Sequence, residues 1–307
     1  MRLLSIRTQG AYHAGAVAGD EVLDVRAALD VLDNRREPDF SALMDNKLED
    51  ALDLYLGGED VISRLLERVR SDSGLAQECR ERRALSPLSE TRLGPPVIAP
   101  GKILAVGLNY AAHAAEQNAR LPESPLIFSK NVTCLAGPGD AIRLPRISNQ
   151  SDYEAELAVV IGKRATSVRR AGALEYVAGY TIMNDVTARD LQRNERQWAR
   201  AKGLDTFGPC GPWLVTKEEL PNPHNLDIVL KLNGEVRQKS NTNDLIFKIP
   251  DILEFVSQDL TLMPGDIIST GTPSGVGVFM NPPVFLKSGD QIEITLEKIG
   301  TLKNRVE

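Results

Sequence analysis

The stretch that decides the fold of this 307-residue chain is Asp152-Tyr153-Glu154-Ala155-Glu156-Leu157-Ala158-Val159-Val160-Ile161-Gly162. Its side chains alternate with a period of two and its second half is apolar throughout, which predicts a β-strand buried on both faces. Glu154 and Glu156 leave the same face because they are two residues apart. Two carboxylates at the mouth of a buried strand repel each other and lose hydration, so they need a positive partner. A divalent cation is the simplest candidate.

A third acidic residue can complete such a site. Residues 177–184 form a second predicted strand that ends at Asp185, and Thr187-Ala188-Arg189-Asp190 resembles a capping box that opens a helix through Gln192. Three carboxylate ligands suit Mg²⁺, Mn²⁺ or Ca²⁺ and disfavour zinc and copper. The alternative is that the two glutamates are solvated strand residues and Asp185 is a helix-capping acid. The apolar faces of the strand favour the metal site, but spacing alone leaves both interpretations open.

The chain contains three histidines, so a histidine base has few candidates. His113 and Glu116 stand three residues apart in a predicted short helix over residues 111–118, where they can meet on one face. Glu116 would then orient the imidazole, and His113 would take a proton from water. The alternative is an ordinary pair on a helix surface. His13 lies in an alternating strand with no carboxylate partner nearby, which predicts a packing or surface role.

Composition and charge exclude several classes of function. The formal charge is −6 with no long basic run, which argues against a nucleic-acid partner. No window approaches the roughly 18 apolar residues of a membrane helix, and residues 1–7 lack the apolar run of a signal peptide. Three distant cysteines fit a reducing compartment. These features predict a cytoplasmic protein with no membrane partner.

Two domains are expected. The Pro/Gly-rich residues 94–101 form a boundary. Before it, short strands up to residue 25 are followed by amphipathic helices that begin near residues 27, 48 and 62, which predicts a small N-terminal α/β accessory domain over residues 1–93. After it, residues 94–307 are rich in predicted strands and contain the candidate site. We expect this to be the catalytic domain.

Several features of the second domain bear on the site. Residues 118–125 contain two prolines and predict a lid loop. Residues 198–213 read as irregular, Asn233-Gly234 suits a type I′ hairpin turn, and the last expected strand covers residues 291–297. The Gly271–Gly277 loop can form an anion nest with the Thr272 hydroxyl, although a tight connection between strands is the simpler interpretation.

Six segments, taken in order, resemble the fumarylacetoacetate hydrolase family over roughly residues 100–300. They are Gly107-Leu108-Asn109-Tyr110-Ala111-Ala112-His113-Ala114-Ala115-Glu116, Phe128-Ser129-Lys130, Asp152-Tyr153-Glu154-Ala155-Glu156-Leu157, Asn184-Asp185-Val186-Thr187-Ala188-Arg189-Asp190-Leu191-Gln192, Lys202-Gly203-Leu204-Asp205 and Thr270-Gly271-Thr272-Pro273-Ser274-Gly275-Val276-Gly277.

The resemblance implies an α+β, β-rich fold: a mixed β-sandwich roll catalytic domain, usually in a homodimer. It implies that Glu154, Glu156 and Asp185 bind Mg²⁺ or Mn²⁺, with Ca²⁺ as a further ion in vitro. It also implies a water-activating dyad of His113 and Glu116 on a lid that orders with ligand. The remaining residues implied to act on an oxo-acid are Lys202 in catalysis and Asn109, Tyr110, Lys130, Gln192, Gly271 and Thr272 in substrate binding.

The expected chemistry is stabilisation of an enolate. A 2-oxo carboxylate would chelate the ion, which would stabilise the enolate formed when an adjacent bond breaks. The first hypothesis is a hydrolase that cleaves a C–C bond in an acylpyruvate-type 2,4-dioxo acid, such as fumarylpyruvate or a diketo sugar acid, in aromatic or sugar-acid catabolism. The alternative is a decarboxylase or tautomerase of 2-oxo dicarboxylates such as oxaloacetate or 2-hydroxyhepta-2,4-diene-1,7-dioate. A third hypothesis is a noncatalytic oxo-acid binding protein.

Overall fold

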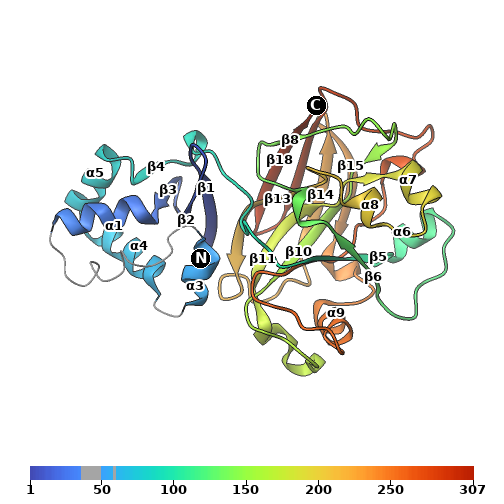
Figure 1. Cartoon of the computed structure of the whole chain (residues 1–307), viewed down its shortest axis with the longest axis horizontal. Coiled ribbons are helices and arrows are strands. Elements are labelled where there is room, and N and C mark those ends of the chain that lie inside the picture. Colours follow the sequence, from blue (N-terminus) through green and yellow to red (C-terminus); the bar gives the residue numbers. More distant parts are fainter. Residues whose placement is uncertain (36–49, 58–59) are drawn as a thin grey trace.

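The structure is a computed structural model that describes residues 1–35, 50–57 and 60–307. In this part of the chain, two mixed or antiparallel sheets pack together and helices border them, so the predicted α+β, β-rich class is confirmed (Figure 1). The larger sheet contains, in spatial order, β4 (Leu85–Pro87), β3 (Glu21–Asp24), β2 (Tyr12–Ala18), β1 (Arg2–Arg7), β13 (Gly208–Thr216), β11 (Val177–Asn184), β10 (Ala155–Ile161), β16 (Ile267–Ser269), β5 (Ile103–Gly107) and β6 (Leu126–Lys130), with β7 (Leu135–Ala136) beside β13. The smaller sheet contains β15 (Glu235–Asn241), β14 (Asp227–Leu232), β17 (Gln291–Leu296), β18 (Gly300–Val306) and β8 (Ala141–Ile142).

The remaining elements are short or peripheral. The strands β9 (Ser151–Asp152) and β12 (Thr187–Ala188) pair with each other beside the site. The helices are α1 (Val25–Asn34), α3 (Ala51–Leu56), α4 (Val61–Ser71), α5 (Ser73–Glu81), α6 (Ala111–Glu116), α7 (Arg189–Asn194), α8 (Ala199–Lys202) and α9 (Ile249–Val256). Short 3₁₀ helices lie at Leu88–Glu90, Val132–Cys134, Arg170–Tyr176, Thr242–Asp244 and Gly277–Phe279. No helix in the described ranges is long and apolar enough to cross a bilayer.

Strand β10 lies in the middle of the protein. Every one of its residues is buried, with β11 on one side and β16 on the other. It packs against β14 of the smaller sheet, and Val159 faces the apolar side of α9. The predicted strand with two buried faces is therefore confirmed. Its regular part begins at Ala155, because Tyr153 and Glu154 connect it to the short strand β9.

The predicted hairpin is also present. The connection between β14 and β15 is Asn233-Gly234, with φ values of 53° and 83°. A type I′ turn needs the left-handed conformation at both positions, which glycine and asparagine adopt at low cost.

Residues 198–213 are more regular than predicted, because they contain α8 and most of β13. The glycines and prolines of Gly208-Pro209-Cys210-Gly211-Pro212 are typical of turns, yet they belong to an interior strand between β1 and β11. The register between β11 and β13 shifts between Tyr180, which pairs with Val215, and Ile182, which pairs with Gly211. This irregularity accommodates Pro212, which cannot donate a ladder hydrogen bond.

Two further elements were not predicted. Helix α5 lies within residues 71–92, where an acidic N-cap residue, Asp72, accepts a hydrogen bond from the Leu75 N–H. Strand β18 follows β17, so residues 291–297 are not the last strand. Its residues alternate between buried and exposed in the folded chain, where β17 and β8 pair with its two edges.

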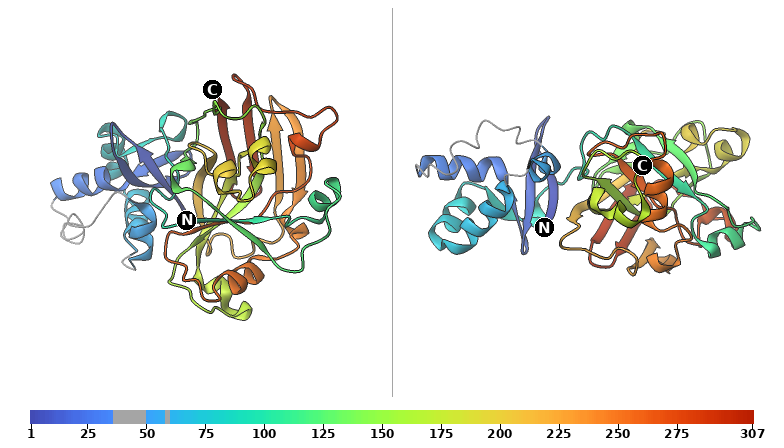
Figure 2. Two further views of the ribbon diagram at one scale, coloured as in Figure 1. Left: turned by 45° about the vertical axis from the view of Figure 1, so that its right-hand side comes forward. Right: turned by 90° about the horizontal axis from the view of Figure 1, so that it is seen from below.

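The N-terminal residues form a lobe beside the rest of the β-structure (Figures 1 and 2). Strand β1 pairs antiparallel with β13, so the larger sheet continues from one lobe into the other. The division at residue 93 stays a prediction. Leu48, the start of the expected second helix, lies outside the described residues, and the described part of that helix begins at Ala51.

The prediction that His13 lacks a carboxylate partner is wrong. Its Nδ1 atom lies 2.9 Å from Asp24 Oδ2. The antiparallel pairing of β2 with β3 brings these residues together although they are eleven positions apart. Asp24 also caps α1 by accepting a hydrogen bond from the Ala27 N–H, so His13 belongs to the structure of the N-terminal lobe.

Candidate active site

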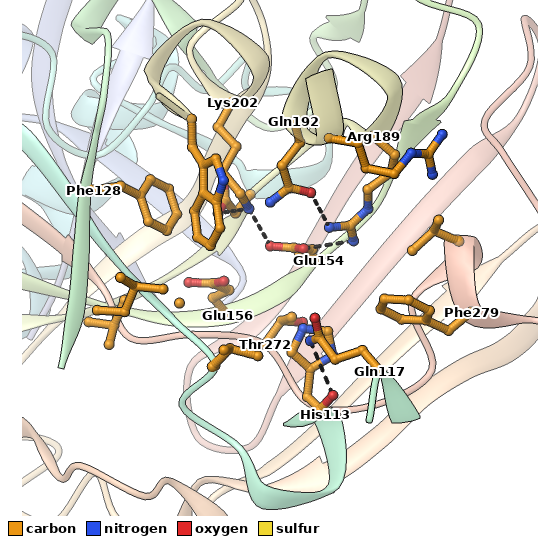
Figure 3. Close-up of a pocket in the computed structure, with 18 residues that line it drawn as sticks. His113, Gln117, Phe128, Glu154, Glu156, Arg189, Gln192, Lys202, Thr272 and Phe279 are labelled. Atoms are coloured by element: carbon orange, nitrogen blue, oxygen red, sulfur yellow. Dashed lines mark hydrogen bonds and ion pairs between the residues drawn. The ribbon is translucent and has the colours of Figure 1, made fainter. Parts of the chain in front are cut away.

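Three buried carboxylates, those of Glu154, Glu156 and Asp185, face one cavity of about 340 Å³. Figure 3 shows the two glutamates in this cavity. One oxygen from each lies within 4.8 Å of the others. The backbone fixes this arrangement, because Glu154 O accepts a hydrogen bond from the Asp185 N–H at 2.9 Å across the ends of β10 and β11. The tertiary structure thus brings together the three residues that the sequence predicted as metal ligands.

Cations surround two of these carboxylates. Lys202 Nζ lies 2.7 Å from Glu154 Oε2 and 2.6 Å from Asp185 Oδ2. Arg189 Nη2 lies 2.7 Å from Glu154 Oε1, and Lys130 Nζ lies 2.6 Å from Asp185 Oδ1. Burial alone would raise the pKa of Glu154, but the charges of Lys202 and Arg189 hold that pKa below its usual range.

Glu156 has a different environment. No Lys or Arg of the described chain lies within ion-pair distance of its carboxylate. Its Oε2 atom accepts hydrogen bonds from the Ser269 hydroxyl at 2.6 Å and the Gly271 N–H at 2.8 Å. Burial raises the pKa of Glu156, and the neighbouring charges of Asp185 and Glu154 raise it further. A divalent cation would relieve this repulsion, so the residues present fit a metal ion with oxygen ligands.

His113 and Glu116 meet as predicted, at one end of the cavity. His113 Nδ1 lies 2.6 Å from Glu116 Oε1, and Glu116 Oε2 accepts a hydrogen bond from the Gly275 N–H at 2.9 Å. Because both oxygens of Glu116 act as hydrogen-bond acceptors, the imidazole nitrogen that faces it, Nδ1, carries the hydrogen. The other nitrogen, His113 Nε2, therefore has the free lone pair. His113 lines the cavity, while Glu116 lies behind it.

The Gly271–Gly277 loop does not form the predicted nest for a substrate carboxylate. The N–H groups of three of its glycines bind carboxylates of the protein itself, because the loop passes directly beside them. Besides the bonds from Gly271 to Glu156 and from Gly275 to Glu116, Gly277 and Val278 donate to Asp152 at 2.8 and 3.0 Å. The loop therefore holds acidic side chains in place, and Thr272 is the loop residue that lines the cavity.

Four predicted substrate contacts lie behind the cavity wall. The Asn109 amide is saturated by backbone groups: Nδ2 donates to Phe247 O at 3.0 Å and Thr270 O at 2.7 Å, and Oδ1 accepts from the Phe247 N–H at 2.8 Å. Lys130 is fully buried and bound to Asp185 and the Phe207 carbonyl. Tyr110 is buried, and Gly271 offers its N–H to Glu156. None of the four is among the residues that line the cavity, and their contact with substrate stays a prediction.

The predicted capping box at Thr187 is also wrong. Thr187 belongs to β12, and its hydroxyl donates a hydrogen bond to the Asp185 carbonyl at 2.9 Å. Helix α7 begins at Arg189 with no side-chain cap. Asp185 is likewise no capping acid, because its carboxylate binds two lysines.

Several functional residues were missed from the sequence. Arg189 bridges Glu154 and Asp152, and its Nη1 donates to Gln192 Oε1 at 3.1 Å. Phe128 and Trp198 form an edge-to-face wall at 5.3 Å, and Lys202 Nζ lies 4.9 Å from the centre of the Phe128 ring. The sequence could have indicated Arg189, because it follows the predicted metal ligand Asp185 by four residues. Nothing local indicated the aromatic wall, because Phe128 lies in β6 and Trp198 directly precedes α8. Other lining residues are Val106, Gly107, Leu108, Gln117, Leu126, Arg193, Val278 and Phe279.

The comparison with known proteins agrees with this geometry. A model of the family described as fumarylacetoacetate (FAA) hydrolase C-terminal matches residues 102–307. The chain belongs to the fumarylacetoacetate hydrolase family. A rat relative, the mitochondrial oxaloacetate tautomerase Fahd2a, is 50% identical over 223 residues, which cover 72% of this chain and 71% of that protein.

Solved structures of the fumarylacetoacetate hydrolase family extend the similarity to the whole chain. A 5-carboxymethyl-2-hydroxymuconate delta-isomerase from Mycobacterium smegmatis is 35% identical, with a TM-score of 0.72 and coverage of 100% of this chain and 98% of that one. A fumarylacetoacetate hydrolase from Exiguobacterium antarcticum is 32% identical, with a TM-score of 0.80 and coverage of 100% and 99%. The chain is therefore an enzyme of this family.

Proposed function

We propose that this protein is a divalent-metal-dependent tautomerase that interconverts the keto and enol forms of a 2-oxo dicarboxylate such as oxaloacetate. The observation that carries the proposal is one cavity that joins a buried carboxylate triad to the free Nε2 atom of His113. The name of the relative at 50% identity supports tautomerisation over C–C hydrolysis. This choice replaces the first hypothesis with its alternative.

The charged residues of the cavity suit an enolate. A divalent ion held by Glu154, Glu156 and Asp185 would supply a Lewis acid that favours the enolate form of a 2-oxo acid. Lys202 adds a buried ammonium group within hydrogen-bond distance of two of these carboxylates. Its charge stabilises negative charge on the substrate oxygen, and the low-dielectric surroundings strengthen this effect.

His113 would move the proton. Nε2 accepts a proton from C3 of the keto form, which leaves an enolate and an imidazolium. The imidazolium then gives up its proton, directly or through water, to the enolate oxygen, which yields the enol and restores neutral His113. In the reverse direction the enol oxygen loses its proton and Nε2 returns one to C3, so the proton count balances. Glu116 keeps the imidazole in the required tautomer and stabilises the imidazolium form.

Arg193 supports a substrate with a second carboxylate. It lines the cavity one helical turn after Arg189, on the same face of α7. Arg189 and Lys202 are paired with acids of the site, whereas Arg193 donates to the neutral side chain of Gln150 and has no acidic partner in the described chain. It is the lining cation available to a distal carboxylate.

A second candidate function is hydrolysis of an acylpyruvate. The specific observation in its favour is the same His113–Glu116 pair, which is equally suited to deprotonate water. The similarity to a structure named fumarylacetoacetate hydrolase is in keeping with it.

The test is product analysis with purified protein and Mg²⁺ or Mn²⁺. We expect faster loss of enol-oxaloacetate absorbance with the four-carbon acid intact by NMR, and loss of the effect with a chelator. Release of CO₂ would indicate a decarboxylase, and pyruvate with a second acid from acylpyruvates would indicate a hydrolase. Metal-dependent binding of oxalate with no turnover would overturn the proposal in favour of an oxo-acid binding protein.

A further inference from the structure

The buried amide of Gln238 connects the segment that carries Glu154 and Glu156 to the loop that carries Thr272. Gln238 lies on β15 of the smaller sheet and has no solvent exposure. Its Oε1 atom accepts a hydrogen bond from the Ala155 N–H at 2.9 Å, at the position between the two glutamates. Its Nε2 atom donates to Thr272 Oγ1 and to Pro273 O, both at 2.8 Å.

The orientation of this amide is fixed by its partners. The Ala155 N–H can only donate, and the Pro273 carbonyl can only accept. A flipped amide would place oxygen against oxygen and nitrogen against N–H in a buried environment, at a high free-energy cost. Nε2 must therefore be the atom that faces Thr272.

This orientation determines what the Thr272 hydroxyl can do. Because Thr272 Oγ1 accepts from Gln238, its own hydrogen is free to be donated elsewhere. Within the described residues, the hydroxyl has Gln238 as its hydrogen-bond partner and no protein acceptor. Thr272 lines the cavity, and Figure 3 shows it beside Glu156 and His113. The acceptor available to the hydroxyl hydrogen is a ligand in the cavity.

The close approach of the loop to β15 is also built into the backbone. The pairing of β14 with β15 shifts between Leu230 and Lys231, so Arg237 forms a bulge. A Cβ atom at Gly275 would meet the Arg237 carbonyl oxygen at 2.1 Å. The glycine therefore lets the loop lie against the strand that carries Gln238.

We propose that Gln238 is a positioning residue that aims the Thr272 hydroxyl at a carboxylate or enolate oxygen of the bound oxo-acid. The hydroxyl is then oriented before substrate arrives, so no reorganisation is needed during the reaction. This inference rests on the proposed function for the identity of the substrate. It concerns a side chain that does not line the cavity and acts through its neighbour.

The test is a double-mutant cycle of Gln238→Glu and Thr272→Val. A carboxylate at position 238 still accepts from the Ala155 N–H but cannot donate, so Thr272 would donate to it instead of to the ligand. We expect Q238E to raise the KM for oxaloacetate, and the Kd for oxalate in the presence of Mg²⁺, by about 10- to 100-fold, the value of one hydrogen bond to a charged group. T272V should have a similar effect.

The double variant decides between two causes of this loss. If Gln238 acts through the hydroxyl, Q238E adds less than about threefold in the T272V background, because the hydroxyl is already gone. Full additivity would mean that the new negative charge simply repels the anion, and would overturn the proposal. Gln291→Glu, an exposed position on β17, controls for added charge and should leave both constants unchanged.

Folding and function are separated in the same experiment. Gln238→Met keeps the shape of the side chain but makes no hydrogen bonds, and thermal melts of this variant identify any loss due to misfolding. If Q238M weakens ligand binding equally with and without the Thr272 hydroxyl, the proposal is again overturned. Wild-type protein that binds oxalate but does not interconvert tautomers would overturn the proposed function, while the oxalate cycle still tests Gln238. Protein that binds neither ligand would overturn both.

Discussion

The Gly275 N–H donates a hydrogen bond of 2.9 Å to Glu116 Oε2. This contact ties the loop after β16 to the carboxylate that holds His113, although the two residues are 159 positions apart. The same loop binds Glu156 through the Gly271 N–H. One backbone segment therefore positions both the proposed proton carrier and a proposed metal ligand.

Replacing Gly275 with alanine tests this connection. Gly275 has a φ of +101°, and an added Cβ would clash with the backbone at Arg237. We expect G275A to lower kcat at least tenfold and to destabilise the protein by about 1–3 kcal/mol. Gly289 is the matched control, because its φ is +94° but nothing lies within 4 Å of its Cβ position. G289A should cost about 1 kcal/mol and leave kcat unchanged; equal activity losses in the two variants would contradict this role.

Removing the imidazole tests the proton carrier. H113A is expected to lower kcat for tautomerisation by about 100-fold or more, the usual contribution of a positioned general base. It should also abolish any hydrolysis of acylpyruvates. His13→Ala removes a histidine that pairs with Asp24 in the N-terminal lobe, so it should leave kcat unchanged. Wild-type turnover by H113A in both assays would rule out the dyad.

Glu156 should couple metal binding to pH. Burial and the charges of Asp185 and Glu154 raise its pKa, so in the metal-free protein it holds a proton that the unfolded chain has already lost. Stability of the metal-free protein should therefore fall as pH rises above about 4.3 toward this raised pKa. Mn²⁺ must displace the proton, so its affinity should increase over the same range.

Glu156→Gln separates these two effects. Without the titrating group, the metal-free melting temperature should lose part of its fall with pH, while Mn²⁺ binding should weaken at least tenfold. Thermal melts with and without chelator and calorimetric Mn²⁺ titrations at several pH values measure both. An unchanged Mn²⁺ affinity would show that Glu156 is not a ligand.

Arg193 should select dicarboxylates. We expect R193Q to raise the KM for oxaloacetate about tenfold, the loss of one charge-assisted contact at an exposed position. The KM for a 2-oxo acid with a single carboxylate, such as phenylpyruvate, should not change. Arg196→Gln is the control, since Arg196 is exposed but does not line the cavity. A rise of equal size for both substrates would contradict a contact with the distal carboxylate.

Local patterns predicted the parts of the site that depend on short-range geometry. Glu154 and Glu156 share a face because strand side chains alternate, and His113 reaches Glu116 because a helix places them one turn apart. The Asn233-Gly234 turn followed from its required φ angles. The homodimer, the domain division and the cytoplasmic location stay predictions.

The tertiary structure decided the features whose partners are distant in the sequence. Glycines and prolines that are typical of turns form part of the interior strand β13, because the neighbouring strands β7 and β11 pair with that part of it. The amides of the Gly271–Gly277 loop bind protein carboxylates rather than substrate, and Gln238 reaches Thr272 from the other sheet. A sequence determines which groups can donate and accept, but only the folded chain determines which of them meet, because a hydrogen bond requires its two atoms to lie about 3 Å apart.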